Sequence, residues 1–138
     1  MWGEQEMRLP GQFVLQRARG RSGTSRPGLD VWLTRQRESA RPPTQPLAAY
    51  GQELFLANGC GACHTIRGTP AEGVVGPDLT HVGSRPSLGA GILPNNAEAF
   101  ARWIAHTDDV KPDVHMPAFG MLPSDDVQAL AAYLDSLE

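Results

Sequence analysis

The two cysteines of the chain, Cys60 and Cys63, lie three residues apart in the stretch "NGCGACHTI", and His64 follows the second directly. Residues at i and i+3 share one face of a helical turn, so both thiols can point the same way. Two thiols provide no disulfide framework and cannot complete a four-thiolate zinc or iron–sulfur site within one chain. The motif therefore restricts the chain to chemistry that needs two thiols and a neighbouring imidazole.

This motif has four interpretations. C-x-x-C-H is the attachment signature of c-type haem, in which two thiols bond one edge of the porphyrin and the histidine ligates its iron. A thioredoxin-like dithiol expects a strand before the motif, whereas the preceding residues are apolar at helical spacing. A zinc site would need His81, His106 or His115, whose spacing fits no common zinc pattern. A structural pair of buried cysteines is the fourth interpretation, and we favour haem.

A haem iron with six ligands needs a second axial ligand, commonly Met or His in electron carriers. Met116 lies between His115 and Pro117, in the stretch "KPDVHMPAFGMLP". Three prolines prevent this stretch from being helical throughout, so a loop can present the Met116 thioether. We expect Met116 to be the second ligand, with Met121 and His115 as weaker candidates.

Apolar residues at helical spacing predict three main helices and an all-α fold. The first helix covers 47–59, the second covers 95–106 with Asn95 or Asn96 as its cap, and the third covers 124–138 with Ser124 as its cap. Residues 65–94 are rich in glycine and proline and predict a long irregular loop. The expected apolar faces are Leu47, Tyr50, Gly51, Leu54 and Phe55; Ala99, Phe100, Trp103 and Ile104; and Val127, Leu130, Ala131, Leu134 and Leu137.

Charge is distributed unevenly along the chain. Residues 1–50 hold eight arginines against four acidic residues, a net charge of +4, and the rest holds four basic against eleven acidic residues, a net charge of −7. Such a change in composition predicts a boundary between two regions. We place it between residues 1–46, a basic segment rich in Pro, Gly and Arg, and residues 47–138.

The N-terminal region is expected to be mostly irregular. "QFVLQ" (12–16) is a candidate short strand, and "LDVWLTRQRE" (29–38) is briefly amphipathic, with Val31, Trp32 and Leu33 to bury. "SARPPTQP" (39–46) predicts a stiff linker. We interpret the arginines as belonging to a solvated linker, so no nucleic-acid partner is expected.

No run of the chain approaches the roughly 18 apolar residues that a membrane-spanning helix needs. The opening "MWGEQEMRLP" has no apolar core of a secretory signal peptide. Haem attachment of this type takes place outside the cytoplasmic membrane. We therefore expect a periplasmic or extracytoplasmic location, and a chain that is either a fragment or has its true start upstream.

Residues 47–138 resemble a class I cytochrome c domain over about two-thirds of the chain. The phrases "GCGACHTIRGT", "VGPDLTHVGSR", "LPNNAEAFARWI" and "KPDVHMPAF" resemble, more narrowly, the cytochrome c domain fused to the C-terminus of subunit II in some bacterial cytochrome c oxidases. The resemblance implies the cytochrome c fold, with three main helices and long loops around one covalent haem c.

The resemblance also implies roles for individual residues. Cys60 and Cys63 would form thioethers to the haem, with His64 and Met116 as axial ligands of the iron. Pro77 would offer its carbonyl to the second nitrogen of His64. Two further residues, Arg85 and Trp103, would approach the haem propionates. The resemblance assigns Gly51, Phe55 and Tyr133 to the crossing of the first and last helices, and His81 and His106 are expected to be structural or exposed.

Residues 1–46 resemble faintly the end of the copper-binding domain that precedes the cytochrome in such subunits, through "GEQEMRLPGQFVLQ" and "LDVWLTRQ". That dinuclear copper centre needs two cysteines and two histidines, and none precedes Cys60. The segment is therefore interpreted as a degenerate remnant, and no dinuclear copper is expected.

The expected function is electron transfer, with no catalysis by this chain alone, because protein ligands would occupy both axial positions. As the electron-entry module of a terminal cytochrome c oxidase, the chain would pass electrons from a donor cytochrome or oxidoreductase to the oxidase. The alternative is a free-standing soluble cytochrome c that shuttles electrons between respiratory complexes. The sequence does not identify the donor or the acceptor.

Overall fold

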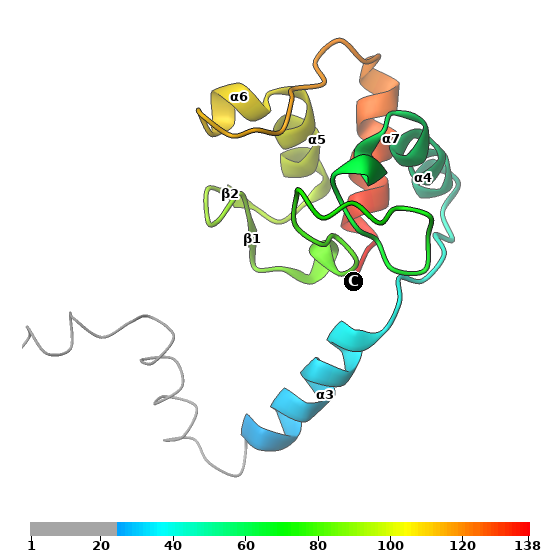
Figure 1. Ribbon diagram of the computed structural model, residues 1–138, viewed down its shortest axis with the longest axis vertical. Helices are drawn as coiled ribbons and strands as arrows, with labels where there is room; N and C mark the ends of the chain where they lie inside the picture. Colours follow the sequence, from blue (N-terminus) through cyan, green and yellow to red (C-terminus); the bar gives the residue numbers. More distant parts are fainter. Residues whose placement is uncertain (1–24) are drawn as a thin grey trace, which may run out of the picture. The chain divides into compact units, whose positions relative to one another are not determined.

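The computed structural model describes residues 25–138, which are mostly helical. The chain divides into two compact units, Met1–Glu38 and Ser39–Glu138. The second unit holds three main helices and two 3₁₀ turns, as the sequence predicted for an all-α fold (Figure 1). Its elements in chain order are α4 (Pro46–Ala57), η1 (Cys60–Ala62), η2 (Val82–Ser84), β1 (Ser87–Leu88), β2 (Leu93–Pro94), α5 (Ala97–Ala105), α6 (Thr107–Val110) and α7 (Ser124–Asp135).

In the first unit the described element is the helix α3, Ser25–Arg37. It is longer than the brief amphipathic stretch that the sequence predicted, and it includes part of the segment expected to be irregular. The side chains predicted to be buried here are exposed, with exposed fractions of 53% for Val31, 54% for Trp32 and 37% for Leu33. That prediction was therefore wrong. One helix cannot cover its own apolar side chains. The candidate strand at 12–16 lies outside the described residues.

The crossing of α4 and α7 depends on a glycine. A Cβ atom at Gly51 would lie 1.9 Å from the carbonyl oxygen of Ala129 and 2.8 Å from Cβ of Tyr133. One turn further along α4, the Phe55 ring meets the Tyr133 ring edge to face, with centroids 5.9 Å apart and planes at 67°. The absent side chain thus lets the two backbones approach, and the aromatic pair fills the space beside them.

The buried face of α4 differs from the one predicted. It consists of Ala48, Gly51 and Phe55, whereas Leu47 and Tyr50 are exposed. The close approach at Gly51 rotates the helix so that its small residues face α7. Tyr50 instead donates a hydrogen bond from its hydroxyl to Asp126, at 2.9 Å, on the surface of the crossing.

The caps of α5 and α7 follow different rules. Asn96 caps α5 as predicted, because its side-chain oxygen accepts a hydrogen bond from the backbone N–H of Ala99 at 2.8 Å. The prediction that Ser124 caps α7 was wrong, since Pro123 occupies the cap position and offers only its carbonyl, to Asp126 and Val127. The predicted buried face of the last helix is confirmed at Val127, Leu130, Ala131 and Leu134, and Leu137, which follows the end of α7, is buried as well.

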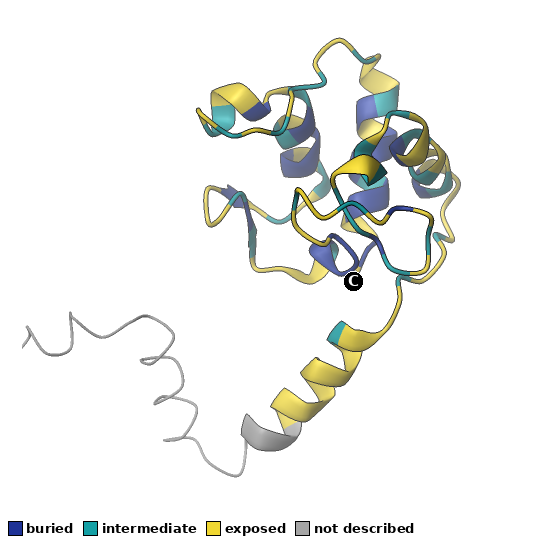
Figure 2. Cartoon of the chain, in the orientation of Figure 1, coloured by how far each residue is buried: buried dark blue, intermediate teal, exposed yellow. Residues whose placement is uncertain are grey.

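The core of the second unit lies where α7 packs against both α4 and α5. Figure 2 shows buried residues concentrated on the facing sides of these helices. The long loop between η1 and α5 has little regular structure, although β1 and β2 pair antiparallel within it. Within residues 25–138 no helix has the length and apolar character needed to cross a lipid bilayer.

The proline-rich stretch before α4 is anchored to this loop. The backbone N–H of Ala40 donates to the carbonyl of Arg67 at 2.8 Å, and Ala40 packs against the core. Gly68, at a φ of +94°, leaves room for the passing chain, because a Cβ there would lie 3.1 Å from Cβ of Ser39. Part of the segment expected to be a linker thus belongs to the packed unit.

We predict that Gly51→Ala lowers the free energy of unfolding by about 1–3 kcal/mol, because the added methyl group forces α4 away from α7. Urea unfolding followed by circular dichroism measures the change. Gly28→Ala in α3 is the matched control, since a Cβ there meets nothing within 4 Å. Equal stability of the two variants would show that the close crossing contributes nothing.

Candidate functional site

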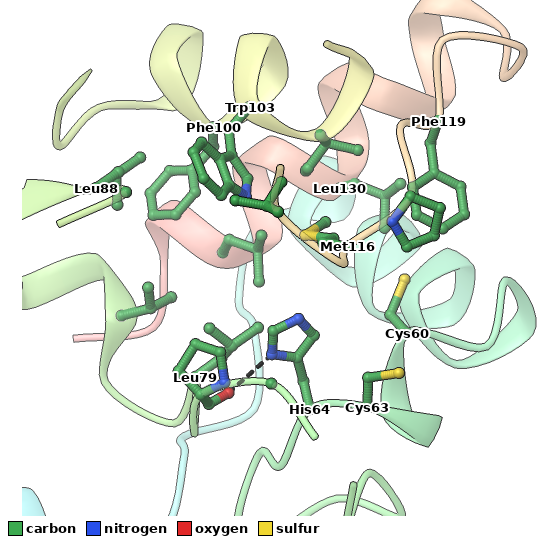
Figure 3. A pocket seen from close by; sticks show the side chains of 18 of the residues that line it. Cys60, Cys63, His64, Leu79, Leu88, Phe100, Trp103, Met116, Phe119 and Leu130 are labelled. Carbon is green, nitrogen blue, oxygen red and sulfur yellow. Dashed lines mark hydrogen bonds between the residues drawn. The ribbon is translucent and has the colours of Figure 1, made fainter. Parts of the chain in front are cut away.

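A cavity of about 480 Å³ lies in the second unit between the turn after α4, the long loop, α5 and the loop before α7 (Figure 3). Its volume falls in the range of roughly 300–1,000 Å³ that is usual for cofactor sites. Apolar side chains make most of its lining, namely Phe55, Leu79, Val82, Leu88, Phe100, Ile104, Val114, Phe119, Leu122, Leu130 and Leu134. The site residues expected from the sequence line it too, and these are Cys60, Cys63, His64, Pro77, Arg85, Trp103 and Met116.

The cysteines enter the cavity from a tight turn at the end of α4. Gly59 has a φ of +77°, a conformation that favours glycine, and it reverses the chain into η1. The backbone N–H groups of Cys63 and His64 both donate to the carbonyl of Cys60, at 3.2 and 3.0 Å. This turn presents two thiols and one imidazole side by side.

Burial raises the pKa of the Cys60 thiol above its ordinary value. Redox-active dithiols work through a cysteine whose pKa is lowered, because the thiolate is the nucleophile. The turn is also preceded by a helix rather than a strand. Both observations favour a role for the cysteines other than dithiol exchange.

The ring of His64 is held by the next loop. Its Nδ1 lies 2.8 Å from the carbonyl oxygen of Pro77. A carbonyl only accepts hydrogen bonds, so the proton resides on Nδ1 and the lone pair of Nε2 is left free to bind a metal. Gly76 makes this contact possible, because a Cβ there would lie 2.4 Å from Cε1 of the ring.

Met116 faces His64 across the cavity, as Figure 3 shows. The loop that carries Met116 is tied to α5 by a hydrogen bond from the N–H of Phe119 to the carbonyl of Ile104, at 2.9 Å. His115 also lines the cavity, whereas Met121 is 76% exposed and is not part of the lining. The thioether of Met116 is therefore the sulfur donor placed opposite the imidazole.

The other predicted residues lie at the cavity through different contacts. The guanidinium of Arg85 donates to the carbonyl of Asp78 at 2.5 Å. The ring of Trp103 packs on the backbone of Gly89, where a Cβ would lie 2.7 Å from Cζ3, and φ at Gly89 is +61°. The supporting roles of Asp78 and Gly89 were missed from the sequence, because each depends on a residue that is distant along the chain, Arg85 for Asp78 and Trp103 for Gly89.

A zinc site receives no support from the described residues. Among residues 25–138 no group of three or more His, Cys, Asp and Glu side chains is close enough to hold a metal ion. His81 is buried, and its Nδ1 lies 2.9 Å from a main-chain oxygen of Glu138. His106 is exposed, so both histidines lie where structural or surface roles were expected.

The sequence profile of the cytochrome c family matches residues 48–138, the part of the chain that builds the cavity. The chain belongs to the cytochrome c family. Membership implies a haem in this cavity and electron transfer as the activity. The resemblance inferred from the sequence is thereby confirmed.

Two curated proteins that resemble this chain carry the name cytochrome c oxidase subunit 2. The one from Alkalihalophilus pseudofirmus is 36% identical over 109 residues, which cover 79% of this chain and 31% of the relative. The one from Bacillus subtilis is 28% identical over 111 residues, covering 78% of this chain and 31% of the relative. The chain thus spans about a third of the length of these curated relatives.

The residues of the cavity fit a c-type haem. The lining is mostly apolar, as a macrocycle requires, and its polar side chains include two thiols, two imidazoles, a thioether, a guanidinium and an indole, together with Asn58 and Lys111. The imidazole of His64 is already fixed in the tautomer that leaves Nε2 free for iron, by the Pro77 carbonyl.

We predict that Gly76→Ala displaces the His64 ring, because the added methyl group would overlap Cε1 and Nδ1. The haem protein should show a weakened proximal bond, seen as a high-spin fraction in the electron paramagnetic resonance spectrum of the oxidised form. The neighbouring exposed residue supplies a control, Val74→Ala, which should leave the spectrum unchanged. A low-spin spectrum in both variants would show that the ring is not confined at Gly76.

Proposed function

We propose that this chain is a monohaem electron carrier with His64 and Met116 as axial ligands, which passes electrons to a terminal cytochrome c oxidase. The observation that carries the proposal is the gathering of both cysteines, the imidazole and the thioether around one apolar cavity. These groups come from two loops separated by about fifty residues of sequence. An ordinary hydrophobic core does not need these polar side chains at one place.

Each residue of the motif has its own task. Cys60 and Cys63 hold the haem edge by thioether bonds, so the group cannot be lost by dissociation. His64 and Met116 would be the two protein ligands of the iron, which would leave no position on it for a substrate. The bound haem supplies a one-electron couple, and Met ligation raises its potential relative to a pair of histidines.

Arg85 and Trp103 are proposed to receive the haem propionates. Both residues line the cavity, and each carries hydrogen-bond donors, a guanidinium and an indole N–H. A cation next to a carboxylate offsets the cost of placing that charge at the edge of an apolar site. The contact of Trp103 with Gly89 fixes the plane of the indole.

The proposed acceptor follows from the relatives, which are named as oxidase subunits. The match to them covers 79% of this chain and thus extends beyond the cytochrome domain into the N-terminal region. An extracytoplasmic location belongs to the same proposal. The free-standing shuttle remains the second candidate, because the shared region is about a third of each relative.

Attachment and ligation are tested by expressing the chain with a haem-attachment system. We expect haem that resists acid–acetone extraction in the wild type, and loss of this covalent haem in a Cys60→Ser, Cys63→Ser double variant. Met116→Ala should abolish the far-red sulfur-to-iron band and lower the midpoint potential, whereas Met121→Ala, at an exposed site, should keep both. A colourless wild type would refute the haem assignment, and a band that survives in Met116→Ala would refute Met116 as the ligand.

Native electrophoresis of membranes from the source organism, stained for haem and for oxidase activity, distinguishes the two carriers. A module of the oxidase should migrate with oxidase activity. Recovery of the chain in the soluble extracytoplasmic fraction, with fast cyanide-sensitive oxidation when membranes are added, would favour the shuttle instead.

A further inference from the structure

The carbonyl that holds His64 belongs to the peptide plane between Pro77 and Asp78, and the backbone before this plane is restricted. The pyrrolidine ring of Pro77 restricts its own φ. The backbone N–H of Gly76 donates to the carbonyl of Cys63 at 2.7 Å, one residue before the histidine. The backbone that leads into this plane is therefore held in place, and the tilt of the carbonyl is left to ψ of Pro77 and φ of Asp78.

On the C-terminal side the plane is held through Asp78. One carboxylate oxygen of Asp78 accepts hydrogen bonds from the backbone N–H of Thr80, at 2.8 Å, and from its hydroxyl, at 2.5 Å. The carbonyl of Asp78 accepts from Arg85 at 2.5 Å. A side chain bonded to the backbone two residues later closes a turn that restricts the dihedral angles between them.

Thr80 connects this turn to the rest of the loop. Its side chain is 1% exposed, and its hydroxyl oxygen accepts a hydrogen bond from the backbone N–H of Arg67 at 2.9 Å. Burial acts to raise the pKa of Asp78, but the hydrogen bonds from Thr80 and the charge of Arg67 lower it below its ordinary value. The carboxylate is thus an ionised acceptor for both donors of Thr80.

The backbone at Arg85 is also held by hydrogen bonds. The side-chain amide of Asn95 donates to the carbonyls of Arg85 and Val82, at 2.6 and 2.9 Å. The segment that carries the guanidinium is thereby attached to the start of α5, so the hydrogen bond to Asp78 has a firm support.

We propose that Asp78 and Thr80, supported by Arg85, are positioning residues that orient the Pro77 carbonyl toward His64 and thereby set the midpoint potential. The proposal rests on the proposed role of His64 as an axial ligand. A well-aligned carbonyl draws on the Nδ1 proton and makes the imidazole a stronger donor to the metal. Stronger donation stabilises the oxidised state, so a misaligned carbonyl raises the midpoint potential.

The test compares Thr80→Val with the wild-type haem protein. Valine keeps the shape of threonine but removes the hydroxyl, so the turn loses the hydrogen bonds to Asp78 and from Arg67. We expect the ratio of reduced to oxidised protein at a fixed potential to rise roughly threefold to tenfold, or about 30–60 mV for one electron. Hydrogen exchange of the His64 Nδ1 proton, measured by NMR, should quicken by about tenfold.

Thr69→Val is the matched control. Thr69 also donates to a backbone carbonyl, that of Ile66 at 2.7 Å, and accepts from a backbone N–H, that of Ala71 at 3.2 Å. Its loss should cost comparable stability in the same loop without moving the potential. Thr80→Ser, which keeps the hydroxyl, should restore the wild-type potential and exchange rate.

Arg85→Lys is a second arm that remains usable if Thr80→Val does not fold. It keeps the positive charge on an exposed residue and removes the guanidinium that reaches Asp78. We expect a smaller rise in potential together with faster exchange of the His64 Nδ1 proton, whereas a rise without faster exchange would come from the propionate contact of Arg85 and would count against the proposal. An unchanged potential and exchange rate in the variants that fold, or equal shifts in Thr80→Val and Thr69→Val, would overturn the proposal. Absence of covalent haem in the wild type would instead refute the proposed function.

Discussion

The hydrogen bond from the His64 ring to the Pro77 carbonyl joins the two halves of the site. It is 2.8 Å long and connects the turn that carries the cysteines to the loop that follows. Because it selects the tautomer, the same bond decides which ring nitrogen faces the cavity. The glycine at position 76 and the proline after it are both required, one for space and one for a restricted backbone. The rest of the loop holds this pair in place.

The helices act as a frame for these loops. The close crossing at Gly51 and the Phe55–Tyr133 pair fix α4 against α7, and α4 ends directly before the cysteine turn. The loop with Met116 is bonded to α5, which also packs against α7. Both sides of the cavity are thus attached, through α4 and α5, to the same helix, α7. A haem carrier benefits from such a frame, because its ligands must keep their positions as the charge on the iron changes.

Much of this architecture could be predicted from the sequence, since its strongest signals are local. The cysteine motif, the Asn96 cap and the apolar face of α7 each depend on neighbouring residues. The crossing at Gly51 and Phe55 was expected from the resemblance, but helical periodicity also placed Leu47 and Tyr50 on the buried face, and both are exposed because the backbone of α4 meets Ala129 at Gly51. The turn of Asp78 and Thr80 was missed because its further partners, Arg67 and Arg85, lie in two other segments of the chain. A proline in place of a side-chain cap explains the error at Ser124.

The hydrogen bond from Ala40 to Arg67 shortens the free segment of chain that precedes the packed unit. A tether that ended at α4 would include residues 40–45, roughly 20 Å of extended chain. With the anchor at Ala40 this length belongs to the packed unit, and the free segment before the unit is shorter by the same amount. The attachment point also lies on the loop of Thr80 rather than on a helix end. A force on the chain before Ala40 would therefore reach the Arg67–Thr80 part of the loop before it reached α4.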